Sequence, residues 1–199
     1  MTTVERHAGF RLSLRRFASD RGGVSAVEFA LILPFMLTLY LGGAELGDGL
    51  AVQFKATLAA RTVADLASQY ITIDSSTMSE ILGAASTVVT PYSAANMTVT
   101  ISELTTTNSS GSATVTWSAS NGTPRSAGAT LTLPTALRSL PSGTSFLWGE
   151  VTYPYTPSMG YVITGTINMY EDTYFFPRMT SSVACTATGS NYSGCSGTD

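Results

Sequence analysis

The chain has 199 residues, a formal net charge of −3 and only 12% charged residues. This length is enough for one domain with a hydrophobic core and one additional segment. The negative charge argues against nucleic-acid binding, which needs a basic surface. A single histidine, His7, and two cysteines argue against histidine-based catalysis and a multi-cysteine zinc site. We therefore expect no enzymatic activity, no resident cofactor and no metal site.

The charges are distributed unevenly along the chain. Residues 1–23 hold five arginines against two acids, whereas residues 44–199 hold five basic and ten acidic residues. Between them, Val24–Gly43 is a run of twenty residues with a single charge, Glu28. As a helix, this run would span about 30 Å, the thickness of the hydrocarbon core of a bilayer. Together with the positive-inside bias, the pattern predicts one membrane crossing, with residues 1–23 as a basic cytoplasmic leader.

Two other interpretations of the apolar run remain open. A secretory signal peptide has an apolar region of about 7–15 residues followed by a small-residue cleavage site. Here the run is longer, and residues 42–46 form no convincing site of that kind. A buried core helix would rarely be flanked by so steep a change in charge. Membrane insertion is thus the expectation, and a signal peptide is the main alternative.

Glu28 is the informative residue of the apolar run. An ionised carboxylate in a membrane segment is costly, so such residues are functional candidates. Glu28 is the fifth residue after Gly23, and cleavage after Gly23 would create a cationic amine at Val24. The carboxylate could then neutralise this amine, or that of an adjacent subunit, within the membrane. The alternative is an acid that is merely tolerated near the membrane edge.

A basic leader, a glycine, an acid at the fifth place and an apolar helix together resemble a type IV prepilin-class processing site. Residues 22–31 (GGVSAVEFAL), the following Leu33-Pro34 and residues 43–47 (GAELG) resemble the start of the TadE/TadG-like proteins. These are minor pilins or pseudopilins of tight-adherence (Tad, Flp) pilus systems. Residues 151–157 (VTYPYTP) and 174–178 (YFFPR) are similar to the far end of that family. The length of the chain favours the TadE type.

This resemblance implies a structural protein of Tad/Flp pilus assembly. It implies processing by a prepilin peptidase, with Gly22, Gly23 and Val24 at the cleavage site and Gly22 as an adjacent alternative. The implied partners are other pilins or pseudopilins, the pilus assembly platform and the lipid bilayer. The implied location is the bacterial inner membrane, with residues 71–199 in the periplasm. The alternative hypothesis is an uncleaved single-pass protein whose outer domain binds an envelope partner or ligand.

The helical pattern continues beyond the membrane segment, so residues 24–70 are expected to form one long helix, kinked at Pro34. Gly43 and Gly47 form a small-x-x-x-small pair where another helix could approach closely, although glycines are also frequent near the ends of membrane helices. From residue 44 onward, large apolar residues recur at spacings of three to five, which predicts a one-sided stripe: Leu46, Leu50, Phe54, Leu58, Val63, Leu66 and Tyr70.

Residues 71–199, which we call the head, are expected to contain a helix and an antiparallel sheet. Thr77 and Glu80 are spaced as a capping box for a helix that ends near Val89, and Pro134–Leu140 is a possible short helix. The first two predicted strands are expected to form a hairpin around residues 108–111, and Glu171-Asp172 a solvated turn. Alternating patterns predict these strands: Met97–Leu104, Ala113–Ala119, Glu150–Tyr155, Gly160–Tyr170 and Tyr174–Arg178.

The fold class that follows is α+β: a long N-terminal transmembrane helix that continues into a pilin-like head with an antiparallel sheet. Near the C-terminus, Cys185 and Cys195 enclose a loop-forming stretch. In an extracytoplasmic head a disulfide closing this loop would add roughly 2–3 kcal/mol. A redox-active pair is the alternative, but the C-x-x-C spacing and a nearby base are missing. We expect a structural disulfide.

Overall fold

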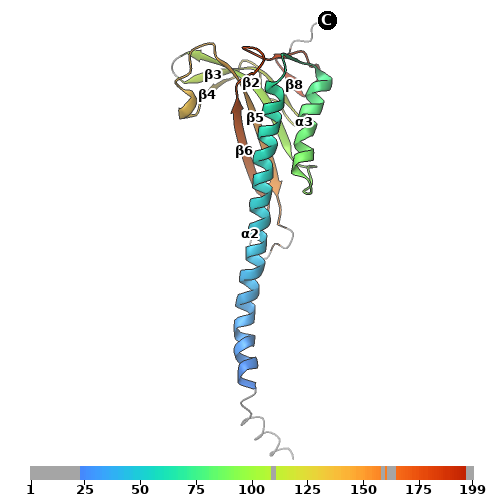
Figure 1. Ribbon diagram of the computed structural model, residues 1–199, viewed down its shortest axis with the longest axis vertical. Helices are drawn as coiled ribbons and strands as arrows, with labels where there is room; N and C mark the ends of the chain where they lie inside the picture. The colour runs from blue at the N-terminus through green and yellow to red at the C-terminus, as the bar shows by residue number, and fades with distance from the viewer. Residues whose placement is uncertain (1–22, 109–110, 158–159, 161–164, 196–199) are drawn as a thin grey trace, which may run out of the picture.

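The computed structural model describes residues 23–108, 111–157, 160 and 165–195. One helix of 45 residues, α2 (Val24–Ser68), extends away from the rest of the molecule and enters the head with its C-terminal half (Figure 1). There it packs against a curled antiparallel sheet and against a second helix, α3 (Ser75–Val89). The α+β fold with a long N-terminal helix is thus confirmed.

The main sheet has the strand order β4-β3-β2-β5-β6, and β8 pairs with β3 beside this path. All of its strand pairs are antiparallel, and β2 and β3 form the predicted hairpin. A separate parallel pair joins β1 (Thr72–Ile73) to β7 (Ala184–Cys185). The strands of the main sheet are β2 (Thr98–Asn108), β3 (Ser112–Ser120), β4 (Thr130–Thr132), β5 (Ser145–Tyr155), β6 (Ile167–Phe175) and β8 (Tyr192–Ser193).

Two of the longer strands differ from their predicted bounds. β5 starts at Ser145, five residues before the predicted Glu150, because its first half is buried on both faces and shows no alternation. β6 is one continuous strand where two strands and a turn at Glu171-Asp172 were expected, so the predicted turn is wrong. Both acids have partners in the folded chain, which is why a strand can carry them. Residues 161–164 of the predicted Gly160–Tyr170 strand lie outside the described residues.

Two predicted helices of the head differ in detail from the structure. α3 begins at Ser75 with Asp74 as its N-cap, and an Asp74 carboxylate oxygen accepts a hydrogen bond from the Thr77 backbone N–H at 2.8 Å. Thr77 is therefore not the cap, because Asp74 lies in the extended backbone conformation that places its side chain over the first turn. The predicted helix Pro134–Leu140 is a single 3-10 turn, η2 (Thr135–Leu137).

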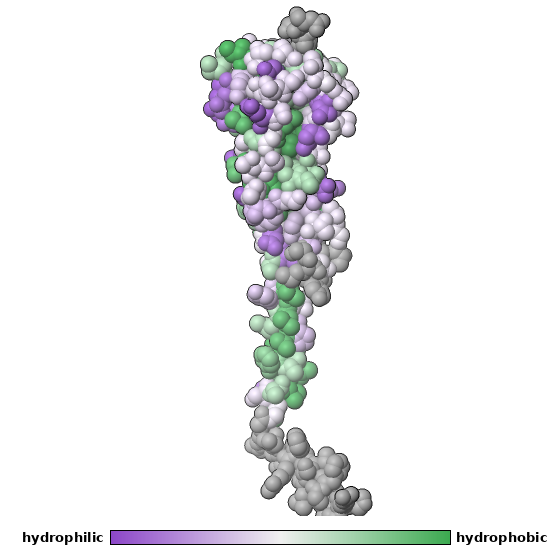
Figure 2. Space-filling model, turned by 90° about the vertical axis from the view of Figure 1, so that its right-hand side faces the viewer, coloured by the Kyte–Doolittle hydropathy of each residue, from purple (hydrophilic) through white to green (hydrophobic). Residues whose placement is uncertain are grey.

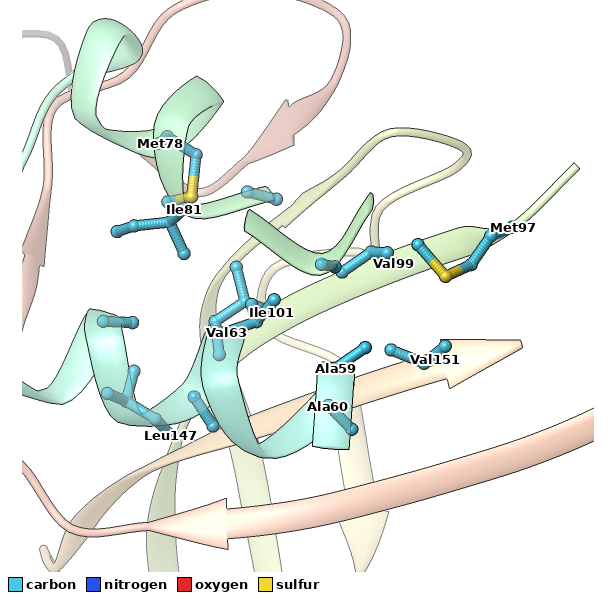
Figure 3. Packing of buried hydrophobic residues seen from close by; sticks show 14 of the residues in the cluster. Ala59, Ala60, Val63, Met78, Ile81, Met97, Val99, Ile101, Leu147 and Val151 are labelled. Atoms are coloured by element: carbon cyan, nitrogen blue, oxygen red, sulfur yellow. The ribbon is translucent and has the colours of Figure 1, made fainter. Parts of the chain in front are cut away.

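Small residues hold α2 close to the sheet. Gly149 of β5 faces the helix, and a Cβ there would lie 2.7 Å from the Ala60 carbonyl oxygen and 3.0 Å from Ala64 Cβ. Figure 3 shows Ala59 and Ala60 on the side of α2 that faces the sheet, near Val151. This close approach is possible because the buried face of α2 is built mainly from alanine and valine: Val52, Ala56, Ala59, Ala60, Val63, Ala64 and Ala67.

The C-terminal segment is tied to both sheets. β7 pairs with β1, and β8 pairs with β3 of the main sheet. Cys185 and Cys195 form a disulfide with an S–S distance of 2.02 Å. The predicted disulfide is thereby confirmed, and it closes the loop that carries the chain from one sheet to the other.

Candidate functional site: the exposed helix and its junction with the head

Within the described residues, α2 is the one helix that is long and apolar enough to cross a membrane. None of its most apolar 18-residue window is buried in the structure, so the interpretation as a core helix is wrong for this segment. Figure 2 shows that the exposed surface of this half of α2 is mostly hydrophobic, whereas the head has many hydrophilic patches. The helix fits a single-pass membrane protein.

The predicted processing residues lie at the start of this helix. Gly22 lies outside the described residues, Gly23 is the N-cap of α2, and Val24 is its first helical residue. Glu28 is exposed on the helix surface, four residues after Val24. Side chains four residues apart lie on the same face of a helix, one turn from each other. The backbone amine that cleavage would create at Val24 and the Glu28 carboxylate would therefore lie about one turn apart at the start of the helix.

The two predicted packing glycines lie where the membrane segment approaches the head. Gly43 and Gly47 are both exposed, and a Cβ added at either would meet no atom within 4 Å. The head therefore leaves this strip of α2 open. A surface without side chains is one that another helix can approach closely.

The predicted one-sided stripe is wrong in part. Val63 is fully buried and Leu66 is partly buried against the core, but the four earlier members face outward. The reason is that the alanine-rich face, not the leucine-rich one, packs on the sheet. The outward members, which we call the outer stripe, are exposed by 58%, 57%, 74% and 51%, respectively: Leu46, Leu50, Phe54 and Leu58.

Tyr155 of β5 fastens the base of the head to α2, and Tyr153 fastens β5 to the segment between α3 and β2. The Tyr155 hydroxyl donates a hydrogen bond to the Glu45 carbonyl oxygen at 3.4 Å, and both residues are buried. The Tyr153 hydroxyl donates to the Ser93 carbonyl oxygen at 2.9 Å. Burial, together with the negative charges of Asp48 and Glu45, raises the pKa of Tyr155. The two stretches that carry the family resemblance, around Glu45 and Tyr155, thus meet in space.

The upper part of the head is fastened to α2 by β6 and the residues after it. The Glu171 carboxylate accepts hydrogen bonds from the Gln53 amide at 3.1 Å and from the Thr57 hydroxyl at 2.9 Å. Arg178 donates its backbone N–H to the Ser68 carbonyl oxygen at 2.9 Å, and its side chain forms an ion pair with Asp65. Sequence reasoning missed Glu171, because only the tertiary fold shows which helix residues lie opposite it.

The outer face of the sheet carries an ion pair between the partly exposed Arg125 and the buried Glu150. Arg125 donates two hydrogen bonds to the Glu150 carboxylate, at 2.6 and 2.7 Å, and the Tyr170 hydroxyl donates a third at 2.6 Å. The Arg125 guanidinium lies 4.1 Å from the centre of the Trp148 ring. Burial and the bond to Glu150 raise the pKa of Tyr170. Because arginine and tyrosine already occupy this carboxylate, the arrangement links β5 to β6 and to the segment after β3 rather than presenting a free base.

The described residues contain no group of three or more His, Cys, Asp or Glu side chains that could hold a metal ion. A cavity of about 390 Å³ lies between α2 and β6, and Leu46 and Leu50 of the outer stripe contribute to its lining. We therefore take the exposed apolar surface of α2 as the candidate functional site.

The model of the TadE-like protein family matches residues 23–65. No curated protein and no solved structure matches the chain at a significant level. The matched segment begins at Gly23 and covers nearly the whole of α2, including Glu28, both packing glycines and the outer stripe. A TadE-like segment on a long apolar helix fits a Tad pilus-associated membrane protein, and this family is structural and not enzymatic. The resemblance seen in the sequence is thereby confirmed for residues 23–65, and the match does not extend to residues 151–157 and 174–178: the long helix of this chain is TadE-like.

Proposed function

We propose that this chain is a membrane-anchored pseudopilin or minor pilin that takes part in assembly of a Tad/Flp-type pilus. Its partners would be a prepilin peptidase, which cleaves after Gly23, and other pilins, pseudopilins and the assembly platform. In this proposal residues 1–23 lie in the cytoplasm, α2 crosses the bacterial inner membrane and the head lies in the periplasm. The reaction at Gly23 belongs to the peptidase, so this chain is its substrate.

The observation that carries the proposal is the outer stripe. α2 has 45 residues and is roughly 68 Å long, more than twice the 30 Å of a bilayer's hydrocarbon core. Its large apolar residues remain exposed from Val24 to Leu58, well beyond a membrane segment that ends near Gly43. Lipid can cover the lower part of this surface but not the upper part. A neighbouring helix would cover both, which is the requirement of lateral packing between subunits.

The proposed mechanism starts with cleavage. The new amine at Val24 and the carboxylate of Glu28 would both lie in an apolar environment, where separate charges are costly. Pairing Glu28 with an amine, its own or that of an adjacent subunit, lowers this cost. Gly43 and Gly47 would then let the neighbouring helix approach closely, and the outer stripe would continue the contact toward the head.

The direct test is the N-terminus of the protein extracted from membranes. Intact mass and N-terminal sequencing should give a product that starts at Val24. A chain that keeps its arginine-rich leader would refute the proposal and favour the uncleaved single-pass alternative. A fully released product that starts beyond Gly43 would instead indicate a secretory signal peptide.

A matched pair of variants tests cleavage itself. Gly23→Leu should abolish processing, because a large side chain would replace the residue that precedes the cut, and the leader should remain on the extracted protein. Gly83→Ala is the control, since Gly83 lies in α3 and a Cβ there meets no atom within 4 Å. Normal processing of Gly23→Leu would show that the peptidase cuts after another residue.

A further inference from the structure

A cavity of about 300 Å³ lies at one end of the head, between α2, the end of β5 and the segment that joins α3 to β2. α3 and β5 both end on the side of the head from which the exposed half of α2 extends (Figure 1). We call this cavity the basal pocket. Its volume is at the lower end of the range for ligand sites, which suits a small organic group.

Three tyrosines contribute to the wall of the basal pocket. Tyr153 and Tyr155 are two residues apart in β5, so their side chains leave the same face of the strand, and both are buried. Tyr92, from the segment after α3, is half-buried. Burial is the main reason why the pKa values of Tyr153 and Tyr155 are raised, and the nearby Tyr92 adds to the rise in both. The three aromatic side chains therefore lie close together around one cavity.

The one formal charge in the lining of the basal pocket is the carboxylate of Asp48. Asp48 is exposed, and it forms neither a hydrogen bond nor an ion pair with another described residue. Lys55, about two turns further along α2, donates instead to the Val88 carbonyl oxygen at 3.1 Å. The π faces of aromatic rings attract cations, and aromatic pockets of this kind bind organic ammonium groups. A carboxylate beside three tyrosines thus favours an organic cation as the ligand.

Two exposed polar side chains of the same pocket are available as donors. The Asn96 amide has no hydrogen-bond partner among the described residues. The Ser93 hydroxyl accepts a hydrogen bond from the Ala95 backbone N–H at 3.3 Å, which leaves its proton available. Amide and hydroxyl donors can hold phosphate oxygens. The lining therefore matches a ligand that carries a cation and a phosphate next to each other.

The position of Asp48 along α2 indicates where such a ligand comes from. Asp48 is five residues after Gly43, which is about 7.5 Å along a helix. The polar headgroup layer extends roughly 5–7 Å beyond the hydrocarbon core on each side of a bilayer. If the membrane segment ends near Gly43, Asp48 lies at the outer edge of this layer, where tyrosines are also enriched. This placement is the same for either orientation of the helix in the membrane.

We propose that the basal pocket binds the headgroup of a zwitterionic phospholipid. The carboxylate of Asp48 pairs with the ammonium group, the tyrosines surround this group, and Asn96 and Ser93 donate to the phosphate. The proposal goes beyond the proposed function, because it requires neither cleavage at Gly23 nor packing of α2 against another helix. It shares with that function only the membrane segment that ends near Gly43.

The first test is native mass spectrometry of the full chain, extracted in detergent and mixed with equal amounts of dioleoyl-phosphatidylethanolamine and dioleoyl-phosphatidylglycerol. The two lipids have the same acyl chains, and only the first has an ammonium group. The chain should retain phosphatidylethanolamine at least about fivefold over phosphatidylglycerol, the effect expected for a cation held by a carboxylate and aromatic rings. Equal retention, or a preference for phosphatidylglycerol, would overturn the proposal.

A matched pair of variants assigns this preference to the pocket. Asp48→Asn removes the charge at nearly constant volume and should abolish the preference. Glu80→Gln makes the same chemical change at an exposed residue of α3 that does not line the pocket, and it should keep the preference. A preference that persists in Asp48→Asn, or that is lost equally in both variants, would contradict a site at Asp48.

The role of the aromatic wall has its own pair of variants. Tyr92→Phe keeps the ring and should retain phosphatidylethanolamine as the wild type does. Tyr92→Leu removes the ring and should lower this retention, while the amides of β5 stay protected from hydrogen exchange if the head is folded. Equal retention by the two variants, with β5 protected in both, would show that the ring does not contact the headgroup.

Soluble probes separate a lipid from other sources of an ammonium group. In nanodiscs of phosphatidylglycerol, soluble phosphoethanolamine should shift the NMR signals of the Asn96 and Thr156 amides more than N-acetyl-lysine amide does. Larger shifts with the lysine probe, together with no lipid preference, would identify a lysine of a protein partner as the ligand and refute the lipid site.

The intact mass in the first test also shows whether the leader is present. A chain that keeps its leader and prefers phosphatidylethanolamine would support the lipid site and refute the pseudopilin proposal. A chain that starts at Val24 without this preference would refute the lipid site and leave the pseudopilin proposal standing. The two failures are therefore distinguishable in one sample.

Discussion

Glu103 is a carboxylate in the core of the head, exposed by only 1%. It accepts a hydrogen bond from the Val183 backbone N–H at 2.7 Å, and the neighbouring Trp117 indole donates to the Val183 carbonyl oxygen at 2.7 Å. These two bonds hold the segment before β7 against the sheet. Burial raises the pKa of Glu103 from its ordinary value of 4.5 to about 7. The charge of the residue that holds the C-terminal segment therefore depends on pH.

The stability of the head should consequently fall as the pH rises from about 4.5 to about 7. In this window the folded chain keeps the Glu103 proton that the unfolded chain has lost, so raising the pH favours unfolding. Glu103→Gln keeps an oxygen that can accept the Val183 bond but does not titrate. We expect Glu103→Gln to flatten this part of the stability profile, measured by urea unfolding at pH 5 and pH 8. If Glu103→Gln leaves the pH dependence of stability unchanged, another titratable group causes that dependence.

At the membrane segment, the second residue-scale prediction concerns Glu28. Glu28→Ala removes the carboxylate but keeps the helix, so insertion into the membrane should be intact. If Glu28 pairs with an amine created by cleavage, pilus assembly should fall at least about tenfold, as an unpaired intramembrane charge costs about 2.5–3.5 kcal/mol. Electron microscopy of cells measures piliation, with Ser25→Ala as the control. Normal piliation in Glu28→Ala would exclude the pairing mechanism.

At the scale of elements, α2 has two faces with different tasks. Its alanine-rich face lies against β5, where Gly149 permits contact with the helix backbone. Its leucine-rich outer stripe stays exposed, and Leu46 and Leu50 of this stripe line the cavity between α2 and β6. Tyr155 of β5, Glu171 of β6 and Arg178 fasten the head to α2. The head is thereby fixed to the helix while the outer stripe stays available to a neighbouring helix.

The close approach of α2 and β5 predicts the effect of two glycine substitutions. Gly149→Ala would put a Cβ 2.7 Å from the Ala60 carbonyl oxygen, and overpacking of this kind costs about 1–3 kcal/mol. Gly47→Ala meets no atom within 4 Å and should be neutral or stabilise the helix by up to about 1 kcal/mol. Thermal unfolding of the detergent-extracted chain measures both. Equal Tm values would mean that the helix is not held so close to the sheet.

At the scale of the whole molecule, a mostly apolar rod is joined to a polar head, and the C-terminal segment closes the head. β7 and β8 belong to different sheets, and the Cys185–Cys195 disulfide connects the chain between them. Glu103 and Trp117 hold the same segment from the core side. The head therefore depends on its last residues for closure, although α2 and the main sheet form most of its core.

Removing the disulfide should lower the stability of the head without altering α2. The bond closes a short loop, so the change from both cysteines to serine should cost roughly 2–3 kcal/mol of unfolding free energy. Urea unfolding with and without a reductant measures this. The reductant should lower the stability of the wild type by a similar amount and leave the variant unchanged. Equal stability of the oxidised wild type and the variant would contradict the structural role.

The sequence by itself determined the long helix, the α+β class and the disulfide, because each depends on local pattern: one apolar run, alternating residues and two cysteines near a loop. It also pointed to the TadE-like family through the residues around Gly23 and Glu28. Only the tertiary structure decided which face of α2 is covered. Alanines pack on the sheet because they allow the closest approach, and the larger leucines, the stronger hydrophobic signal, remain outside. The role of Glu171 and the full extent of β5 were equally hidden, since both depend on contacts between residues far apart in the chain.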